Sequence, residues 1–132
     1  MAESDLSVLL RDLRPTLRPG VYALCAWSGD RAPADVTAIM TFREVEGWTL
    51  IVEMEMAAAH GLQAQFEAAW ITLGVTSDLN AVGLLAAVTR ALADAGIPCN
   101  VVSAMFHDHL FVPAQFGPKA ISVLEVLCSG VP

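Results

Sequence analysis

Residues 77–97 read SDLNAVGLLAAVTRALADAGI, and this stretch decides the interpretation of the chain. Its apolar residues recur at three- and four-residue spacing, which predicts an amphipathic helix over Ala81–Ala95. A short polar segment precedes this helix, and Asp78 or Asn80 is expected to cap its start. Gly96 follows the helix, where a left-handed residue commonly ends one. The stretch therefore predicts a polar loop, then a helix, then a tight turn at Gly96.

Strands are predicted on both sides of this helix. The segment 65–75 precedes it and the segment 100–106 follows it, and both contain many residues that favour strands. A turn at 107–109 then returns the chain as a strand over 110–112, and a last helix opens at Gly117. A strand, a helix, a hairpin and a second helix become the ferredoxin-like arrangement when one more strand is added.

The first half of the chain predicts the same order of elements without the central helix. Its predicted elements are a leading helix over 5–13 capped by Ser4, strands over 21–27, 36–44 and 48–53, and a short helix over 54–60. We therefore predict an α+β fold of two ferredoxin-like repeats, residues 1–62 and 63–132, with a degenerate first repeat. Each sheet is expected to be antiparallel with its helices on one face. The leading helix is expected to cover the sheet surface that the missing helix leaves bare.

Composition narrows the class of protein. The chain has 132 residues, 55% of them hydrophobic, and a formal charge of −7, which excludes intrinsic disorder. Few basic residues are present to neutralise phosphates, so nucleic acid is not an expected partner. The longest uncharged apolar run, 81–88, is far shorter than the ~20 residues that span a bilayer, and the N-terminus is acidic where a signal peptide is basic. We expect a cytoplasmic protein without a membrane partner. Its apolar excess suggests a homodimer.

The three cysteines are far apart and each lies in an apolar stretch. Cys25, Cys99 and Cys128 have neither the CxxC spacing of a zinc site nor the even count of a disulfide framework. We interpret them as small buried apolar residues.

The combination of motifs resembles the ACT domain. The resemblance rests on Ser77–Val88 with Leu92–Ile97, and also on residues 41–50, 69–71, 100–102 and 107–113. The chain is similar to small bacterial proteins with two ACT-like repeats, and its second repeat is similar to the ACT modules of aspartokinases and of a eukaryotic arginine sensor. The resemblance implies a regulatory fold that binds an amino acid at a repeat or subunit interface. The first repeat lacks the Gly-Leu helix start of the family pattern.

An amino acid would bring a carboxylate and an ammonium group to such a site. The free N–H groups at the start of the predicted helix suit the carboxylate, and Gly83 permits its close approach. Asp78 and Asn80 are candidates to receive the ammonium group, with Asn100 adding contacts. The predicted ligand-binding residues are Thr76, Ser77, Asp78, Leu79, Asn80, Ala81, Val82, Gly83, Asn100 and Val101. The alternative is that Asp78 and Asn80 only cap the helix and that Gly83 only serves packing.

His107 and His109 supply a different hypothesis. Two histidines flanking an aspartate suit a transition metal, although they make at most half of a site. The other interpretations are a polar hairpin tip at which Asp108 makes turn hydrogen bonds, or histidines that contact a ligand or partner at an interface. No motif of a nucleophile, base and oxyanion donor is present, so we expect neither an enzyme nor a cofactor. A ligand-free scaffold that binds a partner protein remains the alternative to a regulatory binding module.

Overall fold

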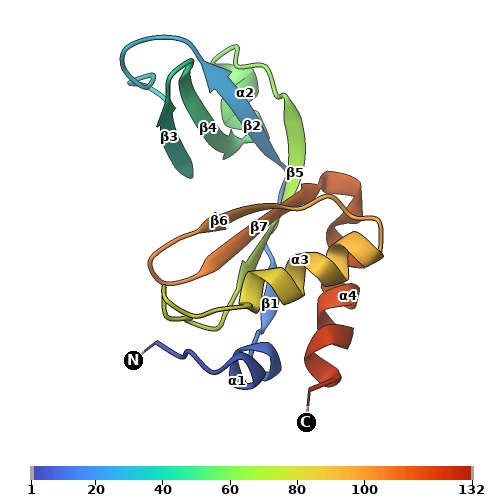
Figure 1. Cartoon of the computed structure of the whole chain (residues 1–132). Helices are drawn as coiled ribbons and strands as arrows, with labels where there is room; N and C mark the ends of the chain where they lie inside the picture. The colour runs from blue at the N-terminus through green and yellow to red at the C-terminus, as the bar shows by residue number, and fades with distance from the viewer. Residues whose placement is uncertain (1, 132) are drawn as a thin grey trace. The chain divides into compact units, whose positions relative to one another are not determined.

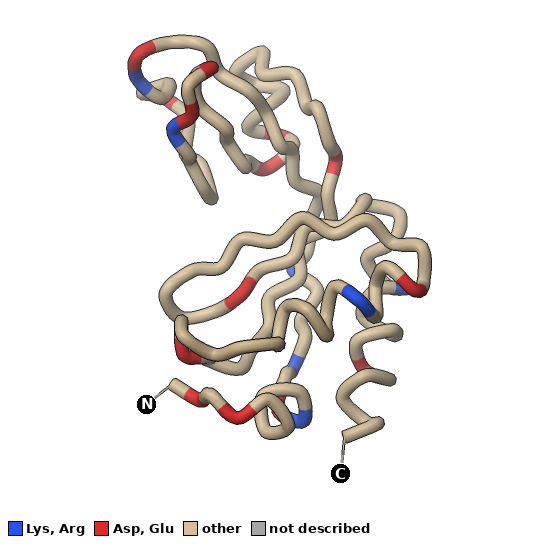
Figure 2. Tube along the Cα trace, in the orientation of Figure 1, with Lys and Arg blue, Asp and Glu red and all other residues tan. Residues whose placement is uncertain are grey.

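The computed structural model describes residues 2–131, which form two compact units (Figure 1). Gly20–Ala68 form one, called here the central unit. Residues 2–19 and 69–131 form the other, called here the terminal unit because it combines the N-terminal and C-terminal segments. Strand β5 (Phe66–Leu73) begins in the central unit and ends in the terminal unit. Lys and Arg residues are dispersed along the chain (Figure 2).

The central unit is an antiparallel sheet with one short helix. Its strands lie in the order β3, β4, β2 and β5, and the helix α2 follows β4. The bounds are β2 Tyr22–Trp27, β3 Met40–Glu44, β4 Gly47–Glu53 and α2 Met54–Ala59. The small core contains Ala23, Cys25, Leu50, Val52 and Ala57. Residues 28–39 connect β2 to β3 without a helix, so the prediction of a degenerate first repeat is confirmed.

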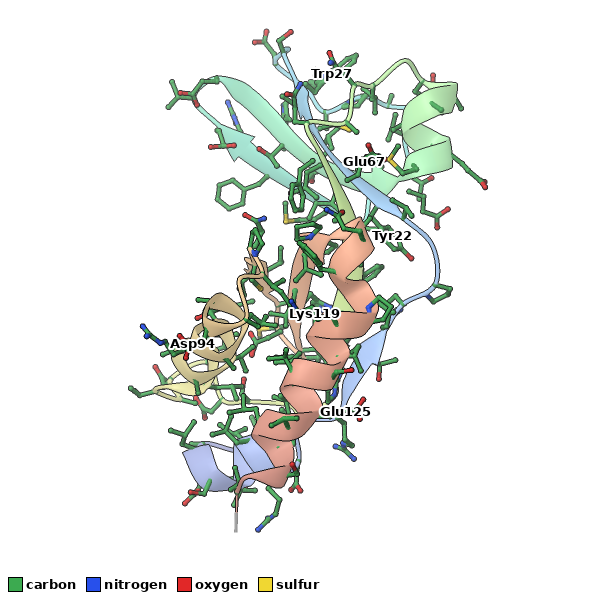
Figure 3. The ribbon with its side chains drawn as sticks, turned by 90° about the vertical axis from the view of Figure 1, so that its right-hand side faces the viewer. Tyr22, Trp27, Glu67, Asp94, Lys119 and Glu125 are labelled. Atoms are coloured by element: carbon green, nitrogen blue, oxygen red, sulfur yellow. The ribbon has the colours of Figure 1, made fainter. Side chains whose placement is uncertain are left out.

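The terminal unit contains the helix that the opening stretch predicts. Its strands lie in the order β1, β5, β7 and β6. The bounds are α1 Leu6–Arg11, β1 Pro15–Leu17, α3 Leu84–Asp94, β6 Asn100–Ser103, β7 Asp108–Pro113, the 3₁₀ turn η1 Ala114–Phe116 and α4 Gly117–Ser129. Asp94 lies at the end of α3, and Lys119 and Glu125 lie on α4 (Figure 3).

The core of the terminal unit lies between its helices and one face of its sheet. Alternate strand residues point to this core, and residues of α3 and α4 meet them there. The fully buried members include Ile71, Leu73, Leu110 and Val112 from the strands and Val88, Leu92, Ala120 and Leu124 from the helices. The predicted α+β fold, with antiparallel strands and helices on one face, is confirmed. Among residues 2–131 no helix is long and apolar enough to cross a membrane.

The N-terminal segment differs from the prediction in three ways. Leu9 and Leu13 are fully buried in the core of the terminal unit, so α1 does not cover the central unit as expected. The helix cap is Asp5, whose Oδ1 accepts a hydrogen bond from Val8 N at 3.2 Å, and not Ser4. A strand that was not predicted, β1, then pairs with β5 through Pro15–Leu17. Pro15 is tolerated there because β1 lies at the sheet edge.

Candidate functional site

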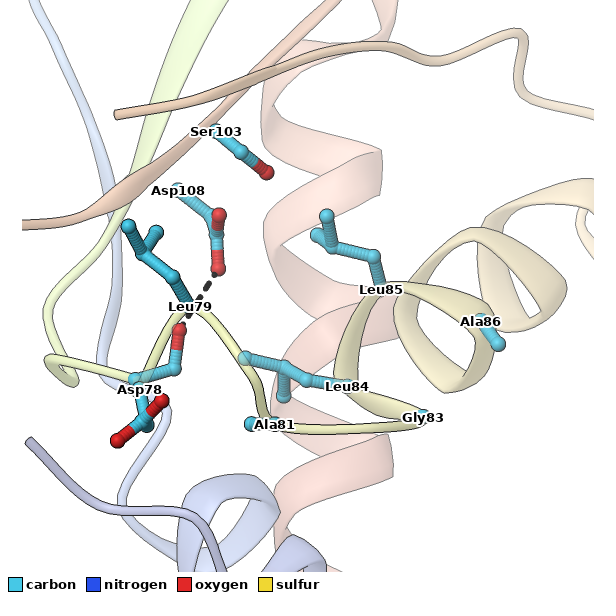
Figure 4. A pocket seen from close by; sticks show the side chains of 10 residues that line it. Asp78, Leu79, Ala81, Gly83, Leu84, Leu85, Ala86, Ser103 and Asp108 are labelled. Atoms are coloured by element: carbon cyan, nitrogen blue, oxygen red, sulfur yellow. Dashed lines mark hydrogen bonds between the residues drawn. The ribbon is translucent and has the colours of Figure 1, made fainter. Parts of the chain in front are cut away.

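A pocket of about 190 Å³ lies at the N-terminal end of α3, within the terminal unit (Figure 4). It is lined by Ser77, Asp78, Leu79, Ala81, Gly83, Leu84, Leu85, Ala86, Ser103 and Asp108. These residues come from the β5–α3 loop, the first turn of α3, the end of β6 and the start of β7. A cavity of about 150 Å³ accommodates benzene. The pocket is therefore large enough for a small organic molecule.

The first turn of α3 lines this pocket, and its backbone N–H groups have no partner within the helix. Gly83 is the N-cap, at φ 102°, and no side chain caps the helix. The bond from Ala87 N to the Gly83 carbonyl, 3.0 Å long, is the first of the helix. The N–H groups of Leu84, Leu85 and Ala86 precede it and have no partner within the helix. The pocket therefore meets the positive end of the helix dipole, which suits an anion.

The loop before α3 is folded on itself, and this corrects the predicted start of the helix. Asp78 Oδ1 accepts a hydrogen bond from Asn80 N at 2.7 Å, and the Asp78 carbonyl accepts one from Ala81 N at 2.9 Å. Because these bonds form a turn at residues 78–81, α3 begins three residues later than predicted, at Leu84. Neither Asp78 nor Asn80 caps the helix.

The N-terminal segment holds this loop in place. The Thr76 carbonyl accepts a hydrogen bond from Glu3 N at 3.0 Å, and Asp78 N donates to the Glu3 carbonyl at 2.8 Å. Glu3 and Ser77 form an isolated parallel bridge. One side of the pocket is thus positioned by residues more than seventy positions earlier in the chain.

A buried carboxylate faces the pocket from the strand side. Asp108 opens β7 and is 7% exposed, the one buried charged residue among residues 2–131. Its Oδ2 accepts a hydrogen bond from Ser77 Oγ at 3.3 Å, shown as the dashed line in Figure 4. No other donor within the described chain reaches the Asp108 carboxylate, so Oδ1 keeps its acceptor capacity. The prediction that Asp108 lies at a hairpin tip is wrong, because the turn is closed earlier by Ala104 N donating to the His107 carbonyl.

The structure brings part of the predicted set together. Ser77, Asp78, Leu79, Ala81 and Gly83 line the pocket, whereas Thr76, Asn80, Val82, Asn100 and Val101 do not. Residues 95–99 separate the end of α3 at Asp94 from Asn100, which begins β6, and the other end of β6, at Ser103, is the one that lines the pocket.

Sequence reasoning missed Leu84, Leu85, Ala86, Ser103 and Asp108. A signal existed for Asp108, because it precedes Leu110 and Val112 by two and four residues and therefore shares their buried face.

His107 and His109 lie outside the pocket. His109 Nδ1 accepts a hydrogen bond from Trp70 Nε1 at 3.0 Å and lies 3.1 Å from Thr72 Oγ1. Burial lowers the pKa of His109, and the nearby positive charges of His107 and Arg18 lower it further. Within residues 2–131 no group of three or more His, Cys, Asp or Glu side chains could hold a metal ion. The structure thus gives no support to the metal-binding alternative.

The lowered pKa of His109 predicts a pH-dependent stability. In the unfolded chain His109 binds a proton near pH 6.5, whereas the folded protein binds it only at lower pH. The contribution to stability is therefore complete above pH 6.5 and is lost as the pH falls through the interval down to the folded pKa. Protonation also places an N–H against the Trp70 N–H. We expect His109→Asn, which keeps an acceptor and cannot titrate, to reduce the fall in melting temperature between pH 7 and pH 5.

The control is His60→Asn, because His60 is exposed and lies at the end of α2. It should leave the pH dependence unchanged. An equal reduction in both variants would contradict the assignment to His109.

Cys25, Cys99 and Cys128 are free thiols. Burial raises the pKa of Cys25, Cys99 and Cys128, that of Cys99 to about 11. Cys25 is buried as predicted, whereas Cys99 and Cys128 are only half-buried. A protonated, buried thiol is a poor nucleophile.

Comparison with known proteins decides the family. Two profiles of the ACT domain match the chain, one over residues 1–69 and the other over residues 65–126. The chain belongs to the ACT domain family. This confirms the predicted two-repeat ACT organisation, and membership suggests a regulatory, ligand-binding role. No curated protein matches this ACT protein.

Solved structures support the same fold. A Vibrio cholerae protein of unknown function, described as a possible transport protein, is 39% identical, with a TM-score of 0.83, covering 93% of this chain and 95% of that one. An Agrobacterium tumefaciens protein is 19% identical, with a TM-score of 0.67, covering 86% and 87%. The regulatory subunit of aspartate kinase from Thermus flavus is 12% identical, with a TM-score of 0.60, covering 86% and 95%. At these low identities the last two show the fold alone.

Proposed function

We propose that this ACT protein is a regulatory module that binds a small amino acid in the pocket at the start of α3. One observation carries the proposal: a buried carboxylate and an uncapped helix start line the same pocket. The N–H groups of Leu84, Leu85 and Ala86 would bind the ligand carboxylate. Asp108 would accept hydrogen bonds from the ligand ammonium group. A zwitterion satisfies both sets of groups at once.

The rest of the pocket limits the size and character of the ligand. Leu79 and Leu85 supply apolar surface, whereas Ser77 and Ser103 supply hydroxyl groups. Membership of the ACT domain family supports a regulatory use of such a site.

Thermal-shift measurements with each of the twenty amino acids test the proposal. A ligand that binds only the folded protein stabilises it by about 2.7 kcal/mol at a hundredfold excess over Kd, which raises the melting temperature by several degrees. We expect one amino acid, or a few similar ones, to produce this shift. If none shifts the transition at millimolar concentration in a folded sample, the scaffold alternative is favoured.

We also propose that the protein is a homodimer. Leu79 and Val82 in the β5–α3 loop and Met105 and Phe106 in the β6–β7 turn are large, apolar and exposed. Exposed apolar patches commonly mark interfaces between protein chains. Light scattering should give twice the chain mass of 14.0 kDa. A monomeric mass that persists at high protein concentration would contradict the dimer.

A further inference from the structure

A second group of polar side chains lies on the face of the terminal unit's sheet that its helices do not cover. We call it the Arg18 cluster, consisting of Arg18, Trp70, Thr72, His107 and His109. Trp70 and Thr72 alternate with the core residues of β5, and His109 alternates with those of β7. The cluster is therefore separate from the pocket at α3, whose Asp108 points to the opposite face.

Several contacts fix the position of Arg18. Its guanidinium carbon lies 4.3 Å from the centre of the Trp70 ring, a cation–π contact. Its Nη1 donates to Thr72 Oγ1 at 3.4 Å, and its backbone N donates to the Trp70 carbonyl at 2.8 Å. Phe111 also stacks on Trp70, with ring centres 5.8 Å apart. The guanidinium is thus positioned before any ligand arrives.

The positive charge of Arg18 is not compensated by a carboxylate. Within residues 2–131 the ion pairs are Arg11–Asp12 and Arg90–Asp94. The neighbours of Arg18 in the cluster are instead two histidines, whose ring centres lie 6.3 Å apart. Burial and the charges of His107 and Arg18 lower the pKa of His109, and the neighbouring Asp108 carboxylate offsets only part of this effect. Arg18 is a positive charge without an ion-pair partner in the described residues, in a chain whose net charge is −7.

The Arg18 cluster has hydrogen-bond donors that suit a negatively charged oxygen ligand. His109 Nδ1 accepts from Trp70, so the neutral ring carries its proton on Nε2 as a donor. Nη1 is the one guanidinium nitrogen of Arg18 with a hydrogen bond in the described chain, which leaves Nε and Nη2 as further donors. A guanidinium fork matches the paired oxygens of a carboxylate or phosphate. The indole of Trp70 lies between Arg18 and Phe111 in this set of contacts. We therefore assign Trp70 the role of positioning Arg18.

We infer that the Arg18 cluster binds a small oxyanion, a carboxylate or phosphate group, through the Arg18 fork and the His109 Nε2–H. The site does not rest on the amino-acid proposal, because no residue of the cluster lines the pocket at α3.

Trp70 provides the readout for a direct test. In the double variant Trp27→Phe, Trp48→Phe all of the tryptophan fluorescence comes from Trp70. We expect inorganic phosphate, acetate or both to change it saturably at constant ionic strength and pH 7. Adding Arg18→Gln should raise the Kd at least about tenfold, since it removes charge-assisted hydrogen bonds. The matched control is Arg90→Gln, which removes an exposed arginine from α3 and should not change the Kd.

A response that does not saturate with either anion, or an equal Kd after Arg18→Gln, would overturn the inference. If Arg18→Gln fails to fold, the wild-type protein labelled with ¹⁵N-arginine supplies the answer. Phosphate or acetate should then shift the Arg18 Nε–H resonance and leave that of Arg90 in place. Equal or absent shifts at both arginines would also overturn the inference. A response to phosphate alone or to acetate alone supports the site and identifies the preferred oxyanion.

Discussion

Replacing Asp108 by Asn is expected to weaken amino-acid binding at least about thirtyfold. Asp108 is buried and in our proposal faces the ligand ammonium group, so the substitution removes one partner of a desolvated charge pair. Truncating one member of such a pair costs about 2–5 kcal/mol of binding free energy. In the ligand-free protein the introduced amide oxygen can still accept the Ser77 hydroxyl, and we expect the fold to persist. Calorimetric titration with the amino acid that gives the largest thermal shift measures the effect.

Ligand analogues separate the two halves of this site. The decarboxylated amine keeps the group that Asp108 would hold, and the deaminated acid keeps the group that the α3 start would hold. Asp108→Asn should therefore weaken the amine and leave the acid nearly unaffected. Asp94→Asn is the matched control, because Asp94 is an exposed carboxylate at the far end of the same helix. If Asp108→Asn and wild type bind the amino acid equally, Asp108 does not hold the ammonium group.

The architecture of the terminal unit could be predicted from local pattern. The apolar spacing of α3 places Leu84, Val88 and Leu92 on one side, and all three are buried in the core. In β5 the buried residues Ala69, Ile71 and Leu73 alternate with half-buried ones, so the covered face of this strand follows from a period of two residues. Such patterns of apolar residues indicate which side chains are buried. The arrangement of helices and strands in the terminal unit follows largely from that burial.

Contacts between residues far apart in the sequence determine the features that the apolar pattern does not predict. Leu9 and Leu13 have the spacing of a helix, but nothing in that spacing says which sheet they cover. Glu3 reaches the loop at Thr76 and Asp78 through backbone groups, which carry no sequence signal. The turn at Asp78 competes with helix capping by the same side chain, and in the folded chain the turn forms.

The sequence predicts a pocket built mainly from the start of α3 and the loop before it. In the structure, β6 and β7 also contribute residues to its lining. The prediction placed Asn100 near the ligand because β6 follows α3 in the sequence. However, the first residue of β6 follows the C-terminal end of α3, and the pocket lies at the N-terminal end of that helix. Only the last residue of β6 lines the pocket. Ser103 and Asp108 are paired residues of β6 and β7. This pairing depends on the register of the two strands, which the sequence of either strand alone does not determine.

Gly47→Ala is expected to destabilise the central unit by about 2–5 kcal/mol, the largest loss of stability that we predict for a single added methyl group. Gly47 begins β4 after the turn at Val45 and Glu46, and its φ is 140°, where a side chain is strained. A Cβ at this position would lie 2.3 Å from the Trp27 carbonyl oxygen of β2. That oxygen belongs to the backbone, so relief requires β2 and β4 to separate where Trp27 pairs with Trp48.

Gly61→Ala is the control that separates backbone strain from the clash. Gly61 also has a positive φ, 65°, but apart from its chain neighbours no heavy atom of the described residues lies within 4 Å of the position that its Cβ would take. It should therefore cost only about 1 kcal/mol, the ordinary cost of a left-handed alanine. Urea denaturation followed by circular dichroism compares the two variants with wild type. Equal losses would show that β4 shifts freely away from β2, and the close approach at Gly47 would then not determine the register of this sheet.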